Sequence, residues 1–482
     1  MDSVRRAIEA FVSSSLEPAV LEPGEPFIPI IKDQFAIEQR GQRLTMQVWD
    51  DQRNLVRRIL RIEQQKRGRL TLVVEKFARR EGLIDLIDRA RPACQELQRK
   101  SSRLVFRERL RLFLSREFPE WKIAELTSEA NLESSLSPAF PRAFLRRGTS
   151  GWAAIGAGPE VNDVGACLAF GLIWLDYLRS RERKVTLEGL AIVVPAGRSS
   201  AISLRLPILN ADAGRFALFT YSDEDFASRV DPADYGNVET VLEPCRRFSR
   251  IEFGELNEIP GFEKVENTDG SISLRVNGWE IARIKEPAGK AQARDIELLA
   301  RGVSEMRSAD AANTMNPLYR NQPEAWLESV VRSRLHVIDP DLRLQPVYGQ
   351  APTFAAGDRG IIDLLACDRH GRLAIIELKA TADLQLPIQT LDYWLRVKWH
   401  LDRGEFSAKG YFPGIELRPD PPRLILIAPA IEFHSTTERI LRYFAPSVCV
   451  ERIGVNAGWR KDLRIMFRAY GHEPPGNTIC TE

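Results

Sequence analysis

Three charged residues interrupt an otherwise apolar stretch, IIDLLACDRHGRLAIIELK, at residues 361–379. Asp363 lies in the first apolar run, and Glu377 and Lys379 stand at the end of the second. Successive strand residues point to opposite faces, so Glu377 and Lys379 share a face if the second run is a strand. Burying two carboxylates together is costly unless a cation compensates them, and a divalent cation prefers oxygen ligands. Two carboxylates, a metal ion and a lysine directed at a water molecule form an arrangement that cleaves phosphodiesters.

A plain ion pair at a strand end is the alternative interpretation, because an isolated D…ExK pattern has a loose gap and common residues. The neighbouring sequence favours the chemical interpretation. A helix predicted after the hairpin carries Gln389. A helix predicted before it, in PEAWLES, carries Glu324 and Glu328, and either glutamate could reach the same site.

With these motifs, residues 315–470 resemble the PD-(D/E)XK nuclease superfamily, and most closely the catalytic domain of NucS-like and RecB-like endonucleases. The resemblance rests on GIIDLL…GRLAIIELK, on QTLDY in the following helix, and on PEAWLE upstream. It covers about a third of the chain and implies a restriction-endonuclease-like fold, a mixed sheet flanked by helices.

The resemblance also implies roles for individual residues. Asp363 and Glu377 would hold Mg²⁺ or Mn²⁺, and Lys379 would be the catalytic lysine. Gln389 would support the site. Glu324 fits the upstream E-x-x-L pattern better than Glu328, and is therefore preferred as the remaining acidic residue.

The function implied is a metal-dependent nuclease, a DNA endonuclease in repair or defence. The N-terminal half does not resemble the DNA-binding domain of NucS, so mismatch specificity is not implied. The alternative function is a non-catalytic nucleic-acid-binding or assembly protein that keeps the fold. Cutting both strands of a duplex would favour a two-fold homodimer.

Length and charge limit where nucleic acid could bind. The chain has 482 residues, enough for two or three domains, and a net charge of only +2, so a nucleic-acid surface would have to be a local patch. The densest basic run lies in RNLVRRILRIEQQKRGR, and either contacts phosphates or is a solvated strand and turn. Its basic residues taken as candidates are Arg57, Arg58, Arg61, Lys66, Arg67 and Arg69.

The element order predicts a multidomain protein of mixed α and β structure. A small β-rich domain is expected over 1–99, an α/β domain over 100–240, a hairpin region and linker over 241–310, and the nuclease-like domain over 311–482. Residues 198–290 read as mostly β, with a hairpin turn at Asn277-Gly278. The segment LRLQPVYG reads as a short strand.

The middle domain repeats the element order of the C-terminal domain, which suggests a second, degenerate copy. GWAAIGAG (151–158) aligns with RLAIIELK (372–379), WLDYLRSR (174–181) with TLDYWLRV (390–397), and LAIVVPAG (190–197) with LILIAPAI (424–431). The alignment places Gly156, Gly158 and Arg142 where Glu377, Lys379 and Asp363 lie. The alternative is that any α/β unit can imitate this order. The copy would be excluded if strands 140–147 and 151–157 were not paired.

Other function classes find no support in the sequence. The six scattered cysteines form no CxxC, and the five histidines form no HExxH, so a zinc site is not expected. No P-loop motif is present. Reduced thiols, the lack of a secretion signal and the short apolar runs predict a cytoplasmic protein that does not enter a membrane.

Overall fold

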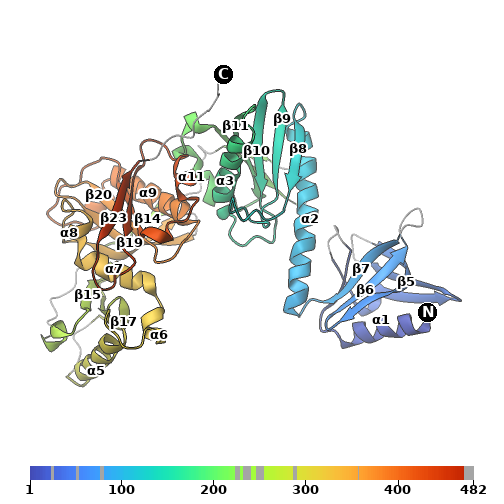
Figure 1. The fold of residues 1–482 in the computed structure, drawn as a ribbon, viewed down its shortest axis with the longest axis horizontal. Coiled ribbons are helices and arrows are strands. Elements are labelled where there is room, and N and C mark those ends of the chain that lie inside the picture. The colour runs from blue at the N-terminus through green and yellow to red at the C-terminus, as the bar shows by residue number, and fades with distance from the viewer. Residues whose placement is uncertain are drawn as a thin grey trace. The chain divides into compact units, whose positions relative to one another are not determined.

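A computed structural model describes residues 1–22, 27–49, 54–75, 81–222, 228–231, 240–245, 254–285, 290–355 and 358–471. Over these residues the chain is a multidomain protein of mixed α and β structure, with four sheets and eleven α-helices (Figure 1). It divides into two compact units. The first comprises Met1–Cys167, Ala191–Ala196 and Thr220–Ser228, and the second Leu168–Leu190, Gly197–Phe219 and Arg229–Glu482.

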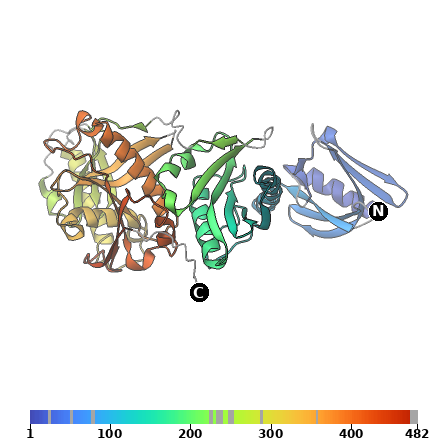
Figure 2. The same cartoon turned by 90° about the horizontal axis from the view of Figure 1, so that it is seen from above.

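The N-terminal sheet has seven strands in the order β2-β1-β7-β6-β5-β4-β3, and helix α1 (Asp2–Ser14) packs across it (Figure 2). Its core is formed by the apolar side of α1, with Ile8 and Phe11, and by alternate residues of the strands. The strands are β1 (Pro18–Leu21), β2 (Ile28–Pro29), β3 (Phe35–Arg40), β4 (Arg43–Trp49), β5 (Asn54–Lys66), β6 (Arg69–Glu75) and β7 (Glu81–Asp88).

The middle sheet has six strands in chain order, β13-β12-β11-β10-β9-β8. Its strands are β8 (Lys122–Thr127), β9 (Arg142–Arg147), β10 (Ser150–Gly156), β11 (Thr186–Pro195), β12 (Arg215–Tyr221) and β13 (Ser228–Val230). Helix α2 (Pro92–Glu117) contacts β8, and α3 (Ala166–Arg181) links β10 to β11. Between β11 and β12 lie the short helices α4 (Ser200–Ser203), η3 (Leu206–Ile208) and η4 (Ala211–Ala213), where the sequence suggested β structure.

Strands β9 and β10 are antiparallel neighbours, so the structure does not exclude a degenerate second copy. The pairing also corrects the alignment. Arg142 is paired with Ile155, not with Gly156. The amide of Ala157 donates to the carbonyl oxygen of Val193 (2.9 Å), as the amide of Lys379 does to that of Ile427 (3.0 Å). By this register Ala157 and Ile155 hold the positions of Lys379 and Glu377.

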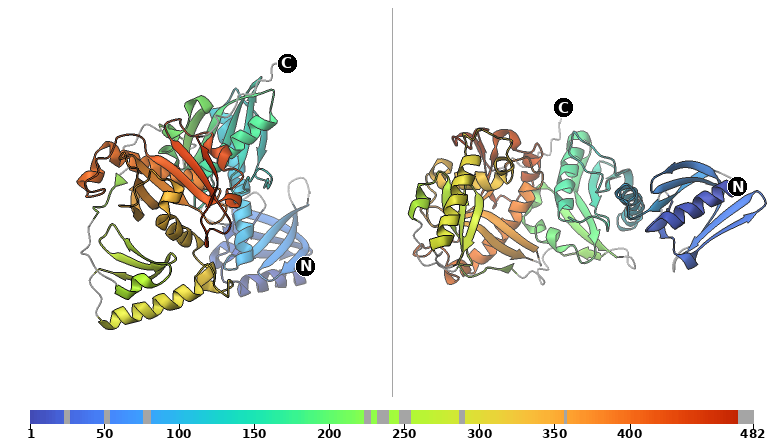
Figure 3. Two further views of the ribbon diagram at one scale, coloured as in Figure 1. Left: turned by 60° about the vertical axis from the view of Figure 1, so that its left-hand side comes forward. Right: turned by 90° about the horizontal axis from the view of Figure 1, so that it is seen from below.

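A three-stranded sheet, β15 (Phe262–Glu266), β16 (Ile272–Val276) and β17 (Trp279–Ile284), packs against α5 (Lys290–Met306) (Figure 3). Asn277 and Gly278 form the β16–β17 turn with φ of 47° and 78°, as the Asn-Gly pair predicts. The turn lies against the next helix, α7 (Pro323–Ser333): a Cβ at Gly278 would lie 2.0 Å from the carbonyl oxygen of Ala325.

The C-terminal sheet has the order β14-β18-β19-β20-β21-β22-β23. Strand β20 is antiparallel to β19 and parallel to β21, and β22 is parallel to β21. The central strands are almost wholly apolar, as buried parallel strands require. The strands are β14 (Thr240–Val241), β18 (Tyr348–Ala355), β19 (Asp358–Cys367), β20 (Leu373–Leu378), β21 (Arg423–Pro429), β22 (Cys449–Val455) and β23 (Ile465–Tyr470). The helices of this region are α6 (Pro317–Arg320), α7, α8 (Leu335–Ile338), α9 (Leu386–Asp402), α10 (Glu405–Ala408) and α11 (Thr437–Leu441).

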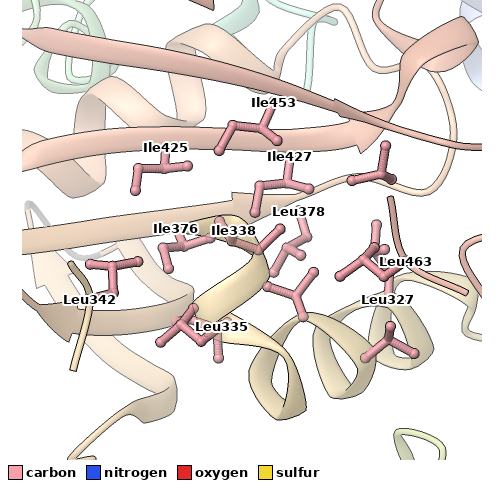
Figure 4. Close-up of a cluster of buried hydrophobic side chains, with 14 of the residues drawn as sticks. Leu327, Leu335, Ile338, Leu342, Ile376, Leu378, Ile425, Ile427, Ile453 and Leu463 are labelled. Atoms are coloured by element: carbon pink, nitrogen blue, oxygen red, sulfur yellow. The ribbon is translucent and has the colours of Figure 1, made fainter. Parts of the chain in front are cut away.

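Helices α7 and α8 cover one face of this sheet (Figure 4). Ile376 and Leu378 of β20 point into that core together with Ile425 and Ile427 of β21. Because side chains alternate along a strand, Glu377 points to the opposite face, where α9 contacts β20. One expectation for this region needs correction: only Tyr348 and Gly349 of the proposed strand LRLQPVYG belong to a strand, β18. No helix in the described ranges is long and apolar enough to cross a membrane.

Candidate active site

The β19–β20 hairpin brings the carboxylates of Asp363 and Glu377 together. Leu364 is paired with Ile376, so Asp363 follows at the position opposite Glu377. The backbone amide of Leu378 donates to Oδ2 of Asp363 at 2.9 Å, which fixes that carboxyl group beside the end of β20. Gly371 closes the hairpin turn with φ of 86°, and a Cβ there would lie 2.1 Å from the carbonyl oxygen of Glu416. The turn therefore requires glycine.

Among the described residues, no cationic side chain forms an ion pair with either carboxyl group. Glu377 is 3% exposed, and its Oε2 has no hydrogen-bond partner among the described residues. Burial raises the pKa of Asp363 to about 7, and the charges of Glu328 and Glu324 act in the same direction. Burial and then the charge of Asp363 raise the pKa of Glu377 well above its ordinary value. The pair therefore tends to hold protons near neutral pH unless a cation is bound.

Lys379 lies beside these two carboxylates, just after the end of β20. Its Nζ is 3.9 Å from Oε2 of Glu324 and 3.7 Å from Oδ2 of Asp383, distances that allow electrostatic attraction but no close hydrogen bond. Burial lowers the pKa of Lys379, but the charges of Glu324, Glu377, Asp383 and Asp363 outweigh it and leave the pKa raised. Lys379 is therefore an ammonium ion at neutral pH. It can orient a water molecule or attract a phosphate oxygen, but it is not a proton acceptor.

The geometry distinguishes the two upstream glutamates. Glu324, in the first turn of α7, is half exposed and faces Lys379. Glu328, one turn later, is 3% exposed and binds Arg332, with Arg275 of β16 at 3.4 Å. Two arginines thus neutralise Glu328, whereas Glu324 remains beside the lysine. This favours Glu324 as the acidic residue that completes the site.

Gln389 lies half-buried in the first turn of α9. Within the described ranges, no hydrogen bond or ion pair connects its side chain to the carboxylates or to Lys379. Asp383 is the residue that sequence reasoning missed. Its Oδ1 accepts from the backbone amide of Gln385 at 2.8 Å, which holds the aspartate at the start of α9 and beside Lys379. The ExKxxxD spacing, in which Asp383 follows Lys379 by four residues, was the available signal.

The basic run of the N-terminal sheet is largely paired with carboxylates. Arg57 binds Glu22 and Arg58 binds Glu75, each at 2.8 Å. Arg61 makes two hydrogen bonds to Glu81 (both 2.9 Å), and Arg69 makes two to Asp85 (3.0 and 2.9 Å). Lys66 and Arg67 are exposed at the β5–β6 turn. Neutralised arginines attract phosphates less strongly than free ones, so this face is less basic than its sequence suggests.

The carboxylate pair fits a small divalent cation. The donors are hard carboxylate oxygens, one of them buried without a hydrogen-bond partner among the described residues, and burial raises the pKa of both carboxyl groups although the charge of Lys379 opposes this shift. Asp363 and Glu377 would hold Mg²⁺ or Mn²⁺, with Lys379 and Glu324 at the rim. A cluster of three or more His, Cys, Asp or Glu side chains able to share a metal does not occur in the described part of the chain.

Comparisons with known proteins add no assignment: no protein-family model matches the chain, and no curated protein matches it.

Proposed function

We propose that the chain is a metal-dependent nuclease that hydrolyses phosphodiester bonds, with DNA as its substrate. One observation carries the proposal: a buried and a half-buried carboxylate face each other on neighbouring strands, no cationic side chain of the described residues forms an ion pair with them, and the charged Lys379 lies nearby. Two carboxylates held this close lower the stability of the folded protein unless a bound cation offsets their charge. The resemblance of residues 315–470 to PD-(D/E)XK nucleases supports the same assignment.

The roles follow from position and charge. Asp363 and Glu377 would bind the cation, which on binding neutralises phosphate charge and lowers the pKa of a water molecule. Lys379, as an ammonium ion, would hold that water or a phosphate oxygen in place. Glu324 and Asp383 would orient the lysine by electrostatic attraction. Gln389 would support the site from α9, the helix on the face of the sheet to which Glu377 points.

The test is a cleavage assay on plasmid, linear duplex, single-stranded DNA and RNA, with Mg²⁺ or Mn²⁺ and with EDTA. Wild type is compared with Asp363→Ala and Lys379→Ala. Asp402→Asn is the matched control, because this exposed carboxylate of the same domain pairs with Lys398 at the far end of α9. We expect metal-dependent cleavage that both site variants lose and the control keeps.

Metal binding is measured separately through thermal unfolding. A bound cation stabilises the folded protein by mass action, so Mg²⁺ or Mn²⁺ should raise the Tm of wild type and of Lys379→Ala, but not of Asp363→Ala. Cleavage that survives in Asp363→Ala would refute the site. Absence of both cleavage and metal stabilisation would favour a non-catalytic binding or assembly protein.

A further inference from the structure

The middle and C-terminal sheets share one design. Strands β8 to β13 lie side by side in chain order, as do β18 to β23. In each sheet the second and third strands form an antiparallel hairpin, β9–β10 and β19–β20, and a long helix follows the third strand, α3 or α9. Shared order alone is weak evidence, because many α/β units have it.

The contacts made by the two helices are stronger evidence, because they are reciprocal. The sequence LDY occurs in α3 and in α9, and its aspartates are Asp176 and Asp392. Asp176 binds Nε of Arg439 at 2.6 Å, while Asp392 binds Nε and Nη2 of Arg205 at 2.6 and 2.5 Å. The arginines are equivalent too: Arg205 lies 15 residues after the start of LAIVVPAG at residue 190, and Arg439 lies 15 after the start of LILIAPAI at residue 424.

One antiparallel bridge joins the chain just beyond the two arginines, one residue out of the register in which Arg205 and Arg439 are equivalent. Asn210 donates its amide to the carbonyl oxygen of Tyr443 (2.8 Å), and Ala445 donates its amide to that of Ile208 (2.9 Å). Leu209 and Phe444 form the antiparallel bridge between these bonds. All these residues, and both ion pairs, belong to the second compact unit. An antiparallel bridge exchanges hydrogen bonds in any case, so the evidence is the two crossed ion pairs, which are the pattern of an isologous interface between two equivalent surfaces.

At the three positions equivalent in the two copies, only the C-terminal copy has acidic residues; near them the middle copy has the single carboxylate of Glu160, beside Gly158. In the register given above, Arg142 takes the place of Asp363, Ile155 that of Glu377, and Ala157 that of Lys379. Arg142 is buried, and its guanidinium donates to the carbonyl oxygens of Ser137 and Glu129. An arginine and two apolar side chains cannot hold a divalent cation.

We propose that residues 122–221 and 348–470 are two copies of one fold joined as an internal dimer with a single live site, so that the protein cuts one strand of duplex DNA at each encounter. The strand-cutting part rests on the proposed function. In that step one water adds to one phosphorus, one P–O ester bond breaks, and the leaving oxygen takes up a proton. The opposite strand stays intact, because a two-fold pair of sites would be needed to reach both strands together.

The experiment follows supercoiled plasmid, in excess over protein, through its open-circular and linear forms with Mg²⁺ or Mn²⁺. Asp363→Ala is the inactive control, and Asp402→Asn the matched active one. We expect open circles to accumulate first and linear DNA to arise only later, from a second, independent nick. Linear DNA that forms from the earliest times in constant proportion to open circles would overturn the proposal and leave the proposed function standing.

If wild type cleaves no plasmid, the proposed function on duplex DNA fails, and the internal dimer is judged by stability alone. Two double-mutant cycles are measured by urea unfolding, one with Asp176→Asn and Arg439→Gln, the other with Asp392→Asn and Arg205→Gln. Equivalent surfaces require that each double variant lose less stability than the sum of its single variants, by similar amounts in both cycles. Additive behaviour in either cycle would overturn the internal dimer.

Discussion

The carboxylate pair Asp363 and Glu377 predicts that the metal-free protein loses stability as pH rises toward neutrality. A carboxyl group whose pKa is raised on folding contributes stability that is complete below its unfolded pKa and is lost as pH rises through its folded pKa. For Asp363 these limits are 3.8 and about 7. The raised pKa of Glu377 acts in the same direction. The perturbation that tests this is Asp363→Asn, which removes the titration but keeps an oxygen for the Leu378 amide.

The expected magnitude follows from the shift. A rise of about 3 units corresponds to a ceiling of about 4 kcal/mol, since one unit is worth about 1.4 kcal/mol. Between pH 5 and pH 7, the ionisation of Asp363 should therefore lower the free energy of unfolding of wild type by up to about 3 kcal/mol relative to that of Asp363→Asn. Bound Mg²⁺ or Mn²⁺ supplies the missing positive charge, so a saturating cation should abolish most of this pH dependence.

Cys367 provides a local probe of this stability, because it is buried on β19, four residues after Asp363. Its labelling by a thiol reagent in graded urea, quantified by peptide mass spectrometry, reports opening of the hairpin. Taking the difference between wild type and variant at each pH cancels the intrinsic pH dependence of the thiol. Asp402→Asn should give a difference that does not change with pH. A difference for Asp363→Asn that is equally flat from pH 5 to pH 7 in EDTA would refute the reasoning.

Further predictions concern the residues around the pair. Lys379→Met should lower the cleavage rate by ~10²–10³-fold while the Mg²⁺-dependent rise in Tm persists, because it removes electrostatic stabilisation but no metal ligand; an unchanged rate would exclude the lysine. Glu324→Gln should slow cleavage at unchanged stability. Glu328→Gln should instead cost about 3 kcal/mol in urea unfolding, because it removes the negative charge that offsets the buried Arg275 and the half-buried Arg332. The reverse pattern would assign the site to Glu328. The pH at which cleavage is half-maximal should fall as the Mg²⁺ concentration is raised, because cation and protons compete for the same carboxylates; a midpoint independent of Mg²⁺ would contradict that competition.

The charged hairpin could be predicted because its signals are local. A glycine turn between two apolar runs sets β19 and β20, and Pro387 in the first turn marks the start of α9. Helix periodicity alone could not choose between Glu324 and Glu328, because residues four apart share one face of a helix, and the preference for Glu324 came only from the E-x-x-L pattern of the resemblance. The choice depends on Arg275, which a different sheet brings to the helix.

Long-range contacts explain the other differences between the expectations from sequence and the structure. The ion pairs of the basic run come from carboxylates on neighbouring strands or distant in sequence, such as Glu22 for Arg57. The proposed alignment of the two copies was one residue out of register on β10. The apolar runs of β10 and β20 give little to distinguish neighbouring registers, and the hydrogen bonds of Ala157 and Lys379 to the next strand resolve it.

The docking of the β16–β17 hairpin on α7 determines how short a catalytic fragment of this chain can be. Arg307 is fully buried and donates hydrogen bonds to the carbonyl oxygens of Asn277 (2.9 Å), Asn321 and Gln322 (both 2.8 Å), so it holds the hairpin turn and the start of α7 together. A fragment beginning at residue 311 would lack both the arginine and the hairpin, and would leave the helix that carries Glu324 unsupported. The shortest piece expected to keep the site therefore begins near residue 254, where the three-stranded sheet and its flanking helices start.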